Sequence, residues 1–294
     1  MKIIIYGKKT EQMTVSAIET IIDTCCLYAE KIFVYRSFFA DFFSQDFIHP
    51  KIVLADSVKD AEEADFLLSI GGDGTFLRAV NFIDKKHIPI LGINMGRLGF
   101  LSNLQLKDLP FIFQSLKNNN YTLEKRMLLK SVSLAGVFGK DAAFALNDIC
   151  FHRTDDSDMI AVDVKVDGKH LNTYWGDGLI VSTPTGSTAY SLSCGGPIIN
   201  PALEVFLISP IASHALTVRP IIVPATTLEI SVKSRTHEFL LSKDSDTQKV
   251  SDNATIMIEK AEFSIDVINF ECQNFYKTIS EKLMWGADKR FSLL

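Results

Sequence analysis

The first 120 residues alternate short apolar runs with longer segments in which apolar side chains recur every three or four positions. A short apolar run predicts a buried strand, and helical spacing predicts an amphipathic helix. The expected strands are 3–6, 32–35, 52–54, 66–70 and 88–93, and the expected helices are 14–30, 75–84 and 109–117. This alternation predicts a doubly wound, parallel α/β domain over residues 1–123.

The pattern changes after residue 123, where short β-rich runs replace the long helical segments. The expected strands are 128–134, 160–166, 179–182, 221–223, 228–232, 239–241, 255–258 and 263–268, and segments 201–208 and 211–215 fit short helices. We therefore expect a mostly β, sandwich-like second domain over residues 124–270. The tail over residues 271–294 looks partly helical, and we expect it to pack back on the first domain.

The strand expected at 66–70 ends in a glycine-rich turn, Gly71-Gly72-Asp73-Gly74-Thr75, and a helical pattern follows at once. This layout presents free backbone N–H groups at a helix N-terminus to a phosphate, and glycine lets the ligand come close. A carboxylate there repels phosphate unless it handles a proton or a metal ion, so we expect Asp73 to act chemically. The alternative is an ordinary strand-to-helix turn in which Asp73 or Thr75 is the N-cap; the turn by itself does not decide between them.

A second informative stretch runs from residue 175 to residue 201 and is rich in hydroxyl side chains. Between Ser182 and Ser193 it holds seven Ser or Thr residues and a tyrosine. Hydroxyls and turn N–H groups can recognise phosphate and ribose without net charge. Asp177, just before a β-rich run, is a candidate acceptor for a ribose hydroxyl or an amide. The alternative is a Ser/Thr-rich surface loop.

The third stretch is a polar pair, Asn147-Asp148, inside an apolar run. The amide of Asn147 can bind the edge of a base, and the carboxylate of Asp148 can accept hydrogen bonds from vicinal hydroxyls. Because Asn-Asp is also a favoured turn pair, a hairpin turn is an equal alternative.

Composition narrows the classes of partner. A net charge of −5 and a pI near 5.7 argue against a nucleic acid or an acidic membrane as the main partner. No apolar run approaches the roughly 18 residues of a membrane span, and the chain opens on an expected strand, not on a signal peptide. The five cysteines are odd in number and form no C-x-x-C pair, so we expect reduced thiols in a cytoplasmic protein. The histidines are scattered, with no H-E-x-x-H, so we expect no structural metal and assign no residue as a metal ligand.

Together, Gly71–Thr75, Asn147-Asp148 and residues 183–190 (Thr-Pro-Thr-Gly-Ser-Thr-Ala-Tyr) resemble, in this order, the NAD kinase family. Residues 92–101 and 213–220 also match its pattern, so the resemblance covers nearly the whole chain. The glycine turn alone also resembles diacylglycerol and sphingosine kinases. The three stretches at these separations are the specific signal.

The resemblance implies that ATP phosphorylates the 2′-hydroxyl of the adenosine ribose of NAD, giving NADP. It also implies a divalent cation such as Mg²⁺, a cytoplasmic location and a homodimer or homotetramer. Asp73 would be the general base and Arg78 would lie near the dinucleotide phosphates or the acceptor ribose. The remaining expected contacts are the turn residues Gly71, Gly72, Gly74 and Thr75, then Asn147 and Asp148 on adenine and ribose, Asp177 on the nicotinamide carboxamide, and Thr188, Ala189, Tyr190, Ser191 and Ser193 around adenosine.

Two departures from the family pattern matter. Many members have glutamate where this chain has Asp148, and many have Asp-Gly-Gln where this chain reads Lys243-Asp244-Ser245-Asp246-Thr247-Gln248. We therefore leave residues 243–248 out of the expected site. No Walker A loop and no G-x-G-x-x-G fingerprint is present, so the nucleotide must be held in another way.

Three alternatives stay open at this stage. A lipid kinase of the diacylglycerol type would share the glycine turn, and a dinucleotide sensor without catalysis would use Asp73 only for binding. Within a kinase, Asp73 is either the base or a magnesium ligand. Preference for NAD or NADH, the phosphoryl donor, the preferred metal and feedback regulation are not specified by these patterns.

Overall fold

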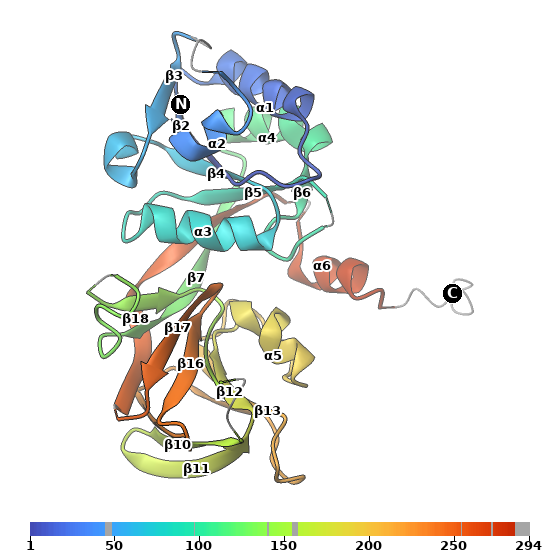
Figure 1. Cartoon of the computed structure of the whole chain (residues 1–294). Coiled ribbons are helices and arrows are strands. Elements are labelled where there is room, and N and C mark those ends of the chain that lie inside the picture. Colours follow the sequence, from blue (N-terminus) through green and yellow to red (C-terminus); the bar gives the residue numbers. More distant parts are fainter. Residues whose placement is uncertain are drawn as a thin grey trace, which may run out of the picture. The chain divides into compact units, whose positions relative to one another are not determined.

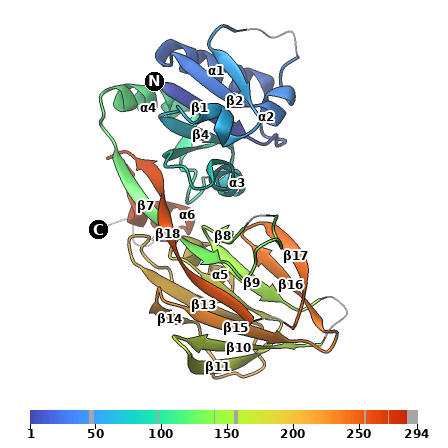
Figure 2. The same ribbon diagram turned by 90° about the vertical axis from the view of Figure 1, so that its left-hand side faces the viewer.

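The computed structural model describes residues 1–44, 49–96, 98–139, 141–154, 158–253, 255–271 and 273–285. It divides the chain into two compact units (Figures 1 and 2). Unit 1 comprises residues 1–125 and the described residues from 265 onward, and unit 2 comprises Arg126–Ser264. The sequence predicts these boundaries at 123/124 and 270/271. The strand β7 (Thr122–Ser131) crosses the first boundary and β18 (Thr255–Asn269) crosses the second, so no turn signal marks either boundary.

Unit 1 is built on a parallel sheet with the spatial order β5-β4-β1-β2-β3. Its strands are β1 (Lys2–Gly7), β2 (Lys31–Tyr35), β3 (Ile52–Ala55), β4 (Phe66–Ile70) and β5 (Ile90–Asn94), and its helices are α1 (Val15–Tyr28), α2 (Arg36–Ala40), α3 (Asp73–Ile83), α4 (Leu109–Lys117) and α6 (Phe275–Lys282). The short β6 (Leu104–Gln105) and the end of β18 join β5. Short 3₁₀ turns at Val58–Ala61 and Leu106–Asp108 precede β4 and α4.

Helices cover both faces of this sheet (Figure 1). Ile3 and Ile5 of β1 share one core with α1 and α4, whose Tyr28 and Phe113 rings stack 5.1 Å apart. The next residue along β1, Tyr6, points to the opposite face and contacts Phe82 of α3. The strand order reverses between β1 and β4, and ligands of such sheets bind beyond the carboxyl ends of the strands at that point. The glycine turn lies at the carboxyl end of β4.

Unit 2 is a sandwich of two antiparallel sheets. One has the order β14-β13-β12-β9-β16-β17, and the other contains β11-β10-β15-β18 with β7 and β8. The strands are β8 (Ala143–Ala145), β9 (Asp148–His152), β10 (Ile160–Val166), β11 (Lys169–Gly176), β12 (Gly178–Ser182), β13 (Val205–Ile211), β14 (Ile221–Pro224), β15 (Leu228–Lys233), β16 (Glu238–Lys243) and β17 (Asp246–Ser251). Alternate residues of both sheets fill one core, for example Phe151, Val162 and Phe239. Between β12 and β13 lie a 3₁₀ turn, Thr185–Thr188, and the one-turn helix α5 (Tyr190–Ser193).

The predicted fold class, a parallel α/β part followed by a mostly β part, is confirmed. The two short helices expected at 201–208 and 211–215 are wrong, because β13 occupies Val205–Ile211 and residues 212–215 form an irregular bend. Phe206, Leu207 and Ile208 are all fully buried, and a continuous apolar run does not reveal its period. The strands expected at 255–258 and 263–268 are one strand, β18. Of the tail expected over 271–294, the described part contains α6, and residues 286–294 lie outside the described residues. Among the described residues, no helix has the length and apolar character to span a membrane.

Candidate active site

At the start of α3, the glycine turn of unit 1 has three backbone N–H groups with no partner among the described residues. Gly72 is the N-cap residue and contributes no side chain, and Asp73 is the first helical residue. The N–H groups of Gly72, Asp73 and Gly74 donate to no other described residue. Together with the helix dipole, unused donors of this kind attract an anion.

The glycines of the turn have different reasons to be glycine. Gly71 has a φ of 145°, and a Cβ there would lie 2.4 Å from the Thr75 hydroxyl, so the fold itself requires glycine. At Gly72 and Gly74 a Cβ would meet nothing within 4 Å, and neither position has a left-handed φ. Both residues are exposed. Neither packing nor backbone conformation requires glycine at these two positions, and a glycine backbone is one that a ligand can approach closely.

The carboxylate of Asp73 is held by the loop that follows β5. Oδ2 accepts from the N–H of Phe100 at 2.9 Å, and Oδ1 accepts from the N–H groups of Leu101 and Ser102, each at 3.0 Å. A carboxylate offers about four lone-pair positions, so one remains unused, on Oδ2. Gly99 lets the loop pass this close, because a Cβ there would lie 2.0 Å from Asp73 Oδ1. The side chain is thus oriented by the backbone and keeps one free acceptor position.

Two basic side chains of unit 1 lie at this end of the sheet. The ammonium of Lys282, the last residue of α6, is 3.6 Å from Asp73 Oδ2. Arg78 is half-buried, one helical turn after Gly74. Burial, with Tyr35 alongside, raises the pKa of Tyr6 to about 12, and the positive charge of Arg78 opposes this rise. Arg78 therefore lies close to Tyr6, near the carboxyl end of β1.

In unit 2, the Asn147-Asp148 pair sits in a turn that is clamped from two sides. The carboxylate of Asp244 accepts from the N–H groups of Leu146, Asn147 and Asp148 at 3.0, 2.7 and 3.3 Å. The Thr183 hydroxyl donates to the carbonyl of Leu146, and the backbone N–H of Thr183 donates to the carbonyl of Asn147 at 2.9 Å. The side-chain amide of Asn147, by contrast, bonds to no described residue. The clamp fixes the backbone and leaves the Asn147 amide available.

Asp148 is buried close to a second carboxylate. Burial, with the charge of Asp244 as a further cause, raises the pKa of Asp148 to about 7. Burial also raises the pKa of Asp244, while the three N–H donors oppose the rise. Near neutral pH Asp148 is therefore present both as a carboxylate that accepts hydrogen bonds and as an acid that can donate one.

The hydroxyl-rich loop uses most of its hydroxyls to build itself. The Ser187 hydroxyl bonds to the carbonyl of Pro184 at 2.7 Å and accepts from the N–H of Ile199 at 2.9 Å. The Ser191 hydroxyl is 2.7 Å from that of Ser209, and both residues are fully buried. These contacts indicate that much of the hydroxyl richness folds the turn, a reason that the sequence pattern does not distinguish from ligand binding.

The residues left at the surface of this loop gather near β9 and β12. The Tyr190 ring, with 40% of the residue exposed, stacks on His152 with centroids 5.6 Å apart. Burial raises the pKa of the Tyr190 hydroxyl, and the neighbouring groups Cys194, Cys150, Asp177 and Asp148 add to this rise. Asp177 Oδ1 accepts from Arg153 Nε at 2.9 Å. Thr188 and Ala189 are partly exposed beside Tyr190, and Ser193 is exposed.

Sequence reasoning missed two side chains that these arrangements depend on. Asp244 was excluded because the Asp-Gly-Gln pattern is absent, yet it organises the Asn147-Asp148 turn. Lys282 lies in a tail whose pattern carries no chemistry of its own. The available signal for Asp244 was its place in a tight turn, where it adopts a φ of 50°.

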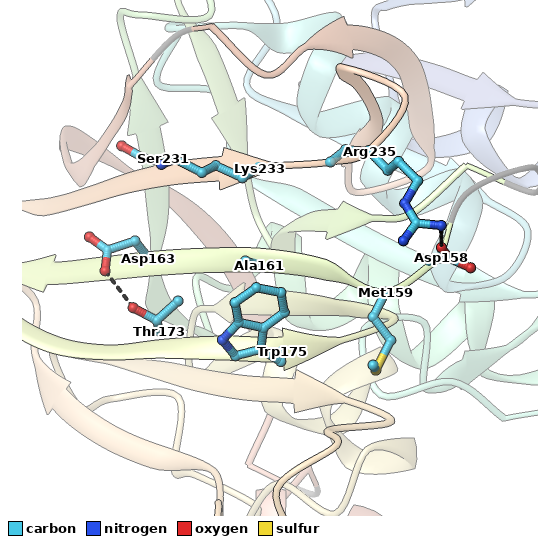
Figure 3. Close-up of a pocket in the computed structure, with 10 residues that line it drawn as sticks. Asp158, Met159, Ala161, Asp163, Thr173, Trp175, Ser231, Lys233 and Arg235 are labelled. Carbon is cyan, nitrogen blue, oxygen red and sulfur yellow. Dashed lines mark hydrogen bonds and ion pairs between the residues drawn. The ribbon is translucent and has the colours of Figure 1, made fainter.

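A separate groove of about 910 Å³ lies on unit 2, on the outer face of β10, β11 and β15 (Figure 3). Trp175, 55% exposed, and Met159 supply its apolar surface. The carboxylate of Asp163 accepts from the Thr173 hydroxyl at 2.8 Å, and Asp158 pairs with Arg235. None of the predicted site residues lines this groove.

Comparisons with known proteins identify the family. Residues 45–121 match the model of the ATP-NAD kinase N-terminal domain, and residues 146–270 match that of the ATP-NAD kinase C-terminal domain. The NAD kinase of Cytophaga hutchinsonii is 45% identical over 232 residues, which cover 79% of each chain. That of Flavobacterium johnsoniae is 38% identical over 297 residues, covering 99% of this chain and 100% of the relative.

Two solved structures share the whole fold. Yeast NADH kinase in complex with NADH has a TM-score of 0.85 at 27% identity, over 99% of this chain and 89% of the yeast chain. An NAD kinase from Archaeoglobus fulgidus in complex with ATP has a TM-score of 0.72 at 25% identity, over 97% and 99% of the two chains. With both domain models matched and a relative aligned along its full length, the chain belongs to the NAD kinase family.

Proposed function

We propose that Asp73 is the general base of the NAD kinase reaction, which this chain carries out as a member of that family. The reaction moves the γ-phosphoryl group of ATP to the 2′-hydroxyl of the adenosine ribose of NAD and yields NADP and ADP. A sugar hydroxyl is a poor nucleophile near neutral pH, so a positioned carboxylate can take its proton as the bond to phosphorus forms. The observation that carries this proposal is the Asp73 carboxylate with one acceptor position left on Oδ2.

The start of α3 is proposed to hold phosphate oxygens of the donor. Its three unused N–H groups, together with Gly72 and Gly74 that lack any packing reason to be glycine, support this assignment. Phosphoryl transfer needs positioning and charge neutralisation more than covalent participation by the protein. Gly71 and Thr75 then maintain the turn, and Arg78 supplies positive charge toward the dinucleotide phosphates or the acceptor ribose.

Unit 2 is proposed to bind the dinucleotide. The side-chain amide of Asn147, which bonds to no described residue, is assigned to the adenine edge, and the carboxylate of Asp148 is assigned to the ribose hydroxyls. Asp177 binds the carboxamide of nicotinamide, and this requires it to exchange its contact with Arg153. The adenosine pocket is formed by Thr188, Ala189, Tyr190 and Ser193, while Ser191 keeps α5 against β13.

A divalent cation, most simply Mg²⁺, is proposed to accompany ATP. Among the described residues, no cluster of three or more His, Cys, Asp or Glu side chains could cage a metal. Magnesium in such enzymes is bound by one or two carboxylates together with substrate phosphates. The free position on Asp73 Oδ2 could take this ion only in place of the ribose hydroxyl, so in this assignment the triphosphate would hold the ion and the ion would neutralise part of its charge.

Of the alternatives, a lipid kinase shares only the glycine turn, whereas both NAD kinase domain models match this chain. A sensor without catalysis is distinguished from an NAD kinase by turnover. We further propose a cytoplasmic homodimer or homotetramer that acts on small molecules, not on nucleic acid or membranes. Light scattering on the purified protein gives its mass in solution, and fractionation of cells gives its location.

The direct test of function is formation of NADP from NAD and Mg-ATP, followed with an NADP-specific dehydrogenase. NADH is assayed in parallel, because a structural relative is an NADH kinase. Steady formation of NADP at a rate proportional to enzyme is expected. Binding of NAD with no NADP over many hours would indicate the sensor.

A further inference from the structure

We propose that Lys282 is the cation that binds the transferring phosphoryl group of ATP. The proposal rests on the assignment of Asp73 and α3 to phosphoryl transfer, and it adds the last residue of the tail helix to that site. Lys282 Nζ lies 3.6 Å from Asp73 Oδ2, the oxygen that keeps a free acceptor position. A group that approaches this oxygen therefore also approaches the ammonium.

The contacts of Lys282 leave its hydrogen-bonding capacity unused. The 3.6 Å separation from Asp73 is an ion-pair distance and too long for a hydrogen bond. Its other contact is the face of the Phe100 ring, whose centroid is 4.7 Å from Nζ. Among the described residues, none accepts a hydrogen bond from this ammonium. Its three N–H donors are free for oxygens of a phosphoryl group.

The tail helix is anchored so that Lys282 is held at this place. The Asn274 side chain caps α6 by accepting from the N–H of Tyr276 at 2.9 Å. Gln273 accepts from the N–H of Phe270 at 2.7 Å and donates to Asn103, just beyond the loop that holds Asp73. Ile279 is buried in the middle of the helix. The start of α6 is thus attached next to the loop that holds the carboxylate, and Lys282 is the last residue of the same short helix.

The chemistry of the step needs a positive charge here. An ionised Asp73 and the terminal phosphate of ATP are both anions, and they repel each other as the phosphoryl group moves. A positive side chain that faces both lowers this repulsion, and its effect grows as charge spreads over the equatorial oxygens. Before ATP binds, Lys282 offsets the charge of Asp73; with ATP bound, its N–H donors turn to the phosphoryl oxygens. Lys277, on the same helix, has a side chain that is 64% exposed and, among the described residues, pairs with Glu281 alone, so we assign it no such role.

The test compares Lys282→Met, Lys282→Arg and the matched control Lys277→Met. Methionine keeps an apolar stem against Phe100 and removes the charge, so the melting temperature is expected to stay within a few degrees of wild type. We expect Lys282→Met to lower kcat/KM for Mg-ATP by about 10-fold or more, as for loss of a hydrogen bond to a charged group. The KM for NAD should stay within about two-fold, and Lys282→Arg should recover part of the loss.

Binding provides a second readout that is independent of turnover. Calorimetry with the non-hydrolysable donor β,γ-methylene-ATP and Mg²⁺ should show weaker binding to Lys282→Met and unchanged binding to Lys277→Met. Wild-type kcat/KM for ATP in a folded Lys282→Met variant would overturn the proposal, as would equal losses for ATP and NAD. If the wild-type protein makes no NADP at all, the NAD kinase function itself is contradicted. If wild type and Lys282→Met are both fully active, only the role of Lys282 is contradicted.

Discussion

Substitution of Gly99 by alanine would displace the Asp73 carboxylate without changing Asp73 itself. The added Cβ would lie 2.0 Å from Asp73 Oδ1, whereas ordinary contact begins at 3.4 Å. The carboxylate or the loop must therefore move by about 1.4 Å. The three N–H bonds to Asp73, now at 2.9 to 3.0 Å, do not survive such a shift. Because a misplacement of about 1 Å can cost roughly 100-fold in rate, we expect kcat to fall by about that factor.

The assay is steady-state formation of NADP by Gly99→Ala, Asp73→Asn and the double variant. If Gly99→Ala acts through Asp73, the double variant is no slower than Asp73→Asn alone, since the two changes remove the same contribution. Loss of the three bonds is expected to lower the free energy of unfolding by about 1–3 kcal/mol, measured by urea denaturation. Wild-type kcat for a folded Gly99→Ala protein, or rate losses that multiply in the double variant, would refute the assignment.

Three other outcomes are expected. Gly74→Ala should raise the free energy of unfolding by up to about 1 kcal/mol, because alanine is the better helix residue. It should also lower kcat/KM for ATP roughly 10-fold or more, because phosphate can no longer approach the backbone closely. Unchanged activity would show that no ligand contacts this backbone. Asn147→Ala and Tyr190→Ala should raise the KM for NAD more than that for ATP, and equal effects on both would contradict the dinucleotide pocket. Because the pKa of Asp148 is raised to about 7 in the folded protein, the folded state binds more protons than the unfolded chain between about pH 4 and 7. The free energy of unfolding should therefore fall as pH rises through this range and level off above it, and Asp148→Asn should remove this contribution; parallel urea-denaturation curves for the two proteins from pH 5 to 8 would show that Asp148 is not the group.

The sequence predicted the parts of this molecule whose signal is local. Phe66–Ile70 reads as a buried strand and its glycine turn as the start of a helix because both depend on neighbouring residues. A short helix was expected at 201–208, where β13 begins, since Phe206–Ile208 is apolar at every position and its neighbours in the sheet are far away in the chain. The period of such a run is set by what covers its two faces.

In the candidate site, too, the sequence indicated features with a local signal and missed those that depend on distant segments. Asp73 and Asn147-Asp148 were singled out because polar residues interrupt apolar runs there. The N–H donors that orient Asp73, the carboxylate of Asp244 and the ammonium of Lys282 all come from distant segments, and no local pattern records such pairings. The hydroxyl-rich loop was expected to bind ligand, whereas Ser187 and Ser191 turn inward to bond within unit 2.

The central claim is that the carboxylate of Asp73 removes the proton from the ribose hydroxyl. The most direct measurement is single-turnover formation of NADP by Asp73→Asn, with NAD binding followed in the same preparation by calorimetry. The amide cannot take the proton, so we expect less than a few per cent of the wild-type rate while NAD still binds. A rate above that level in a protein that binds NAD normally would contradict the role of Asp73 as the base.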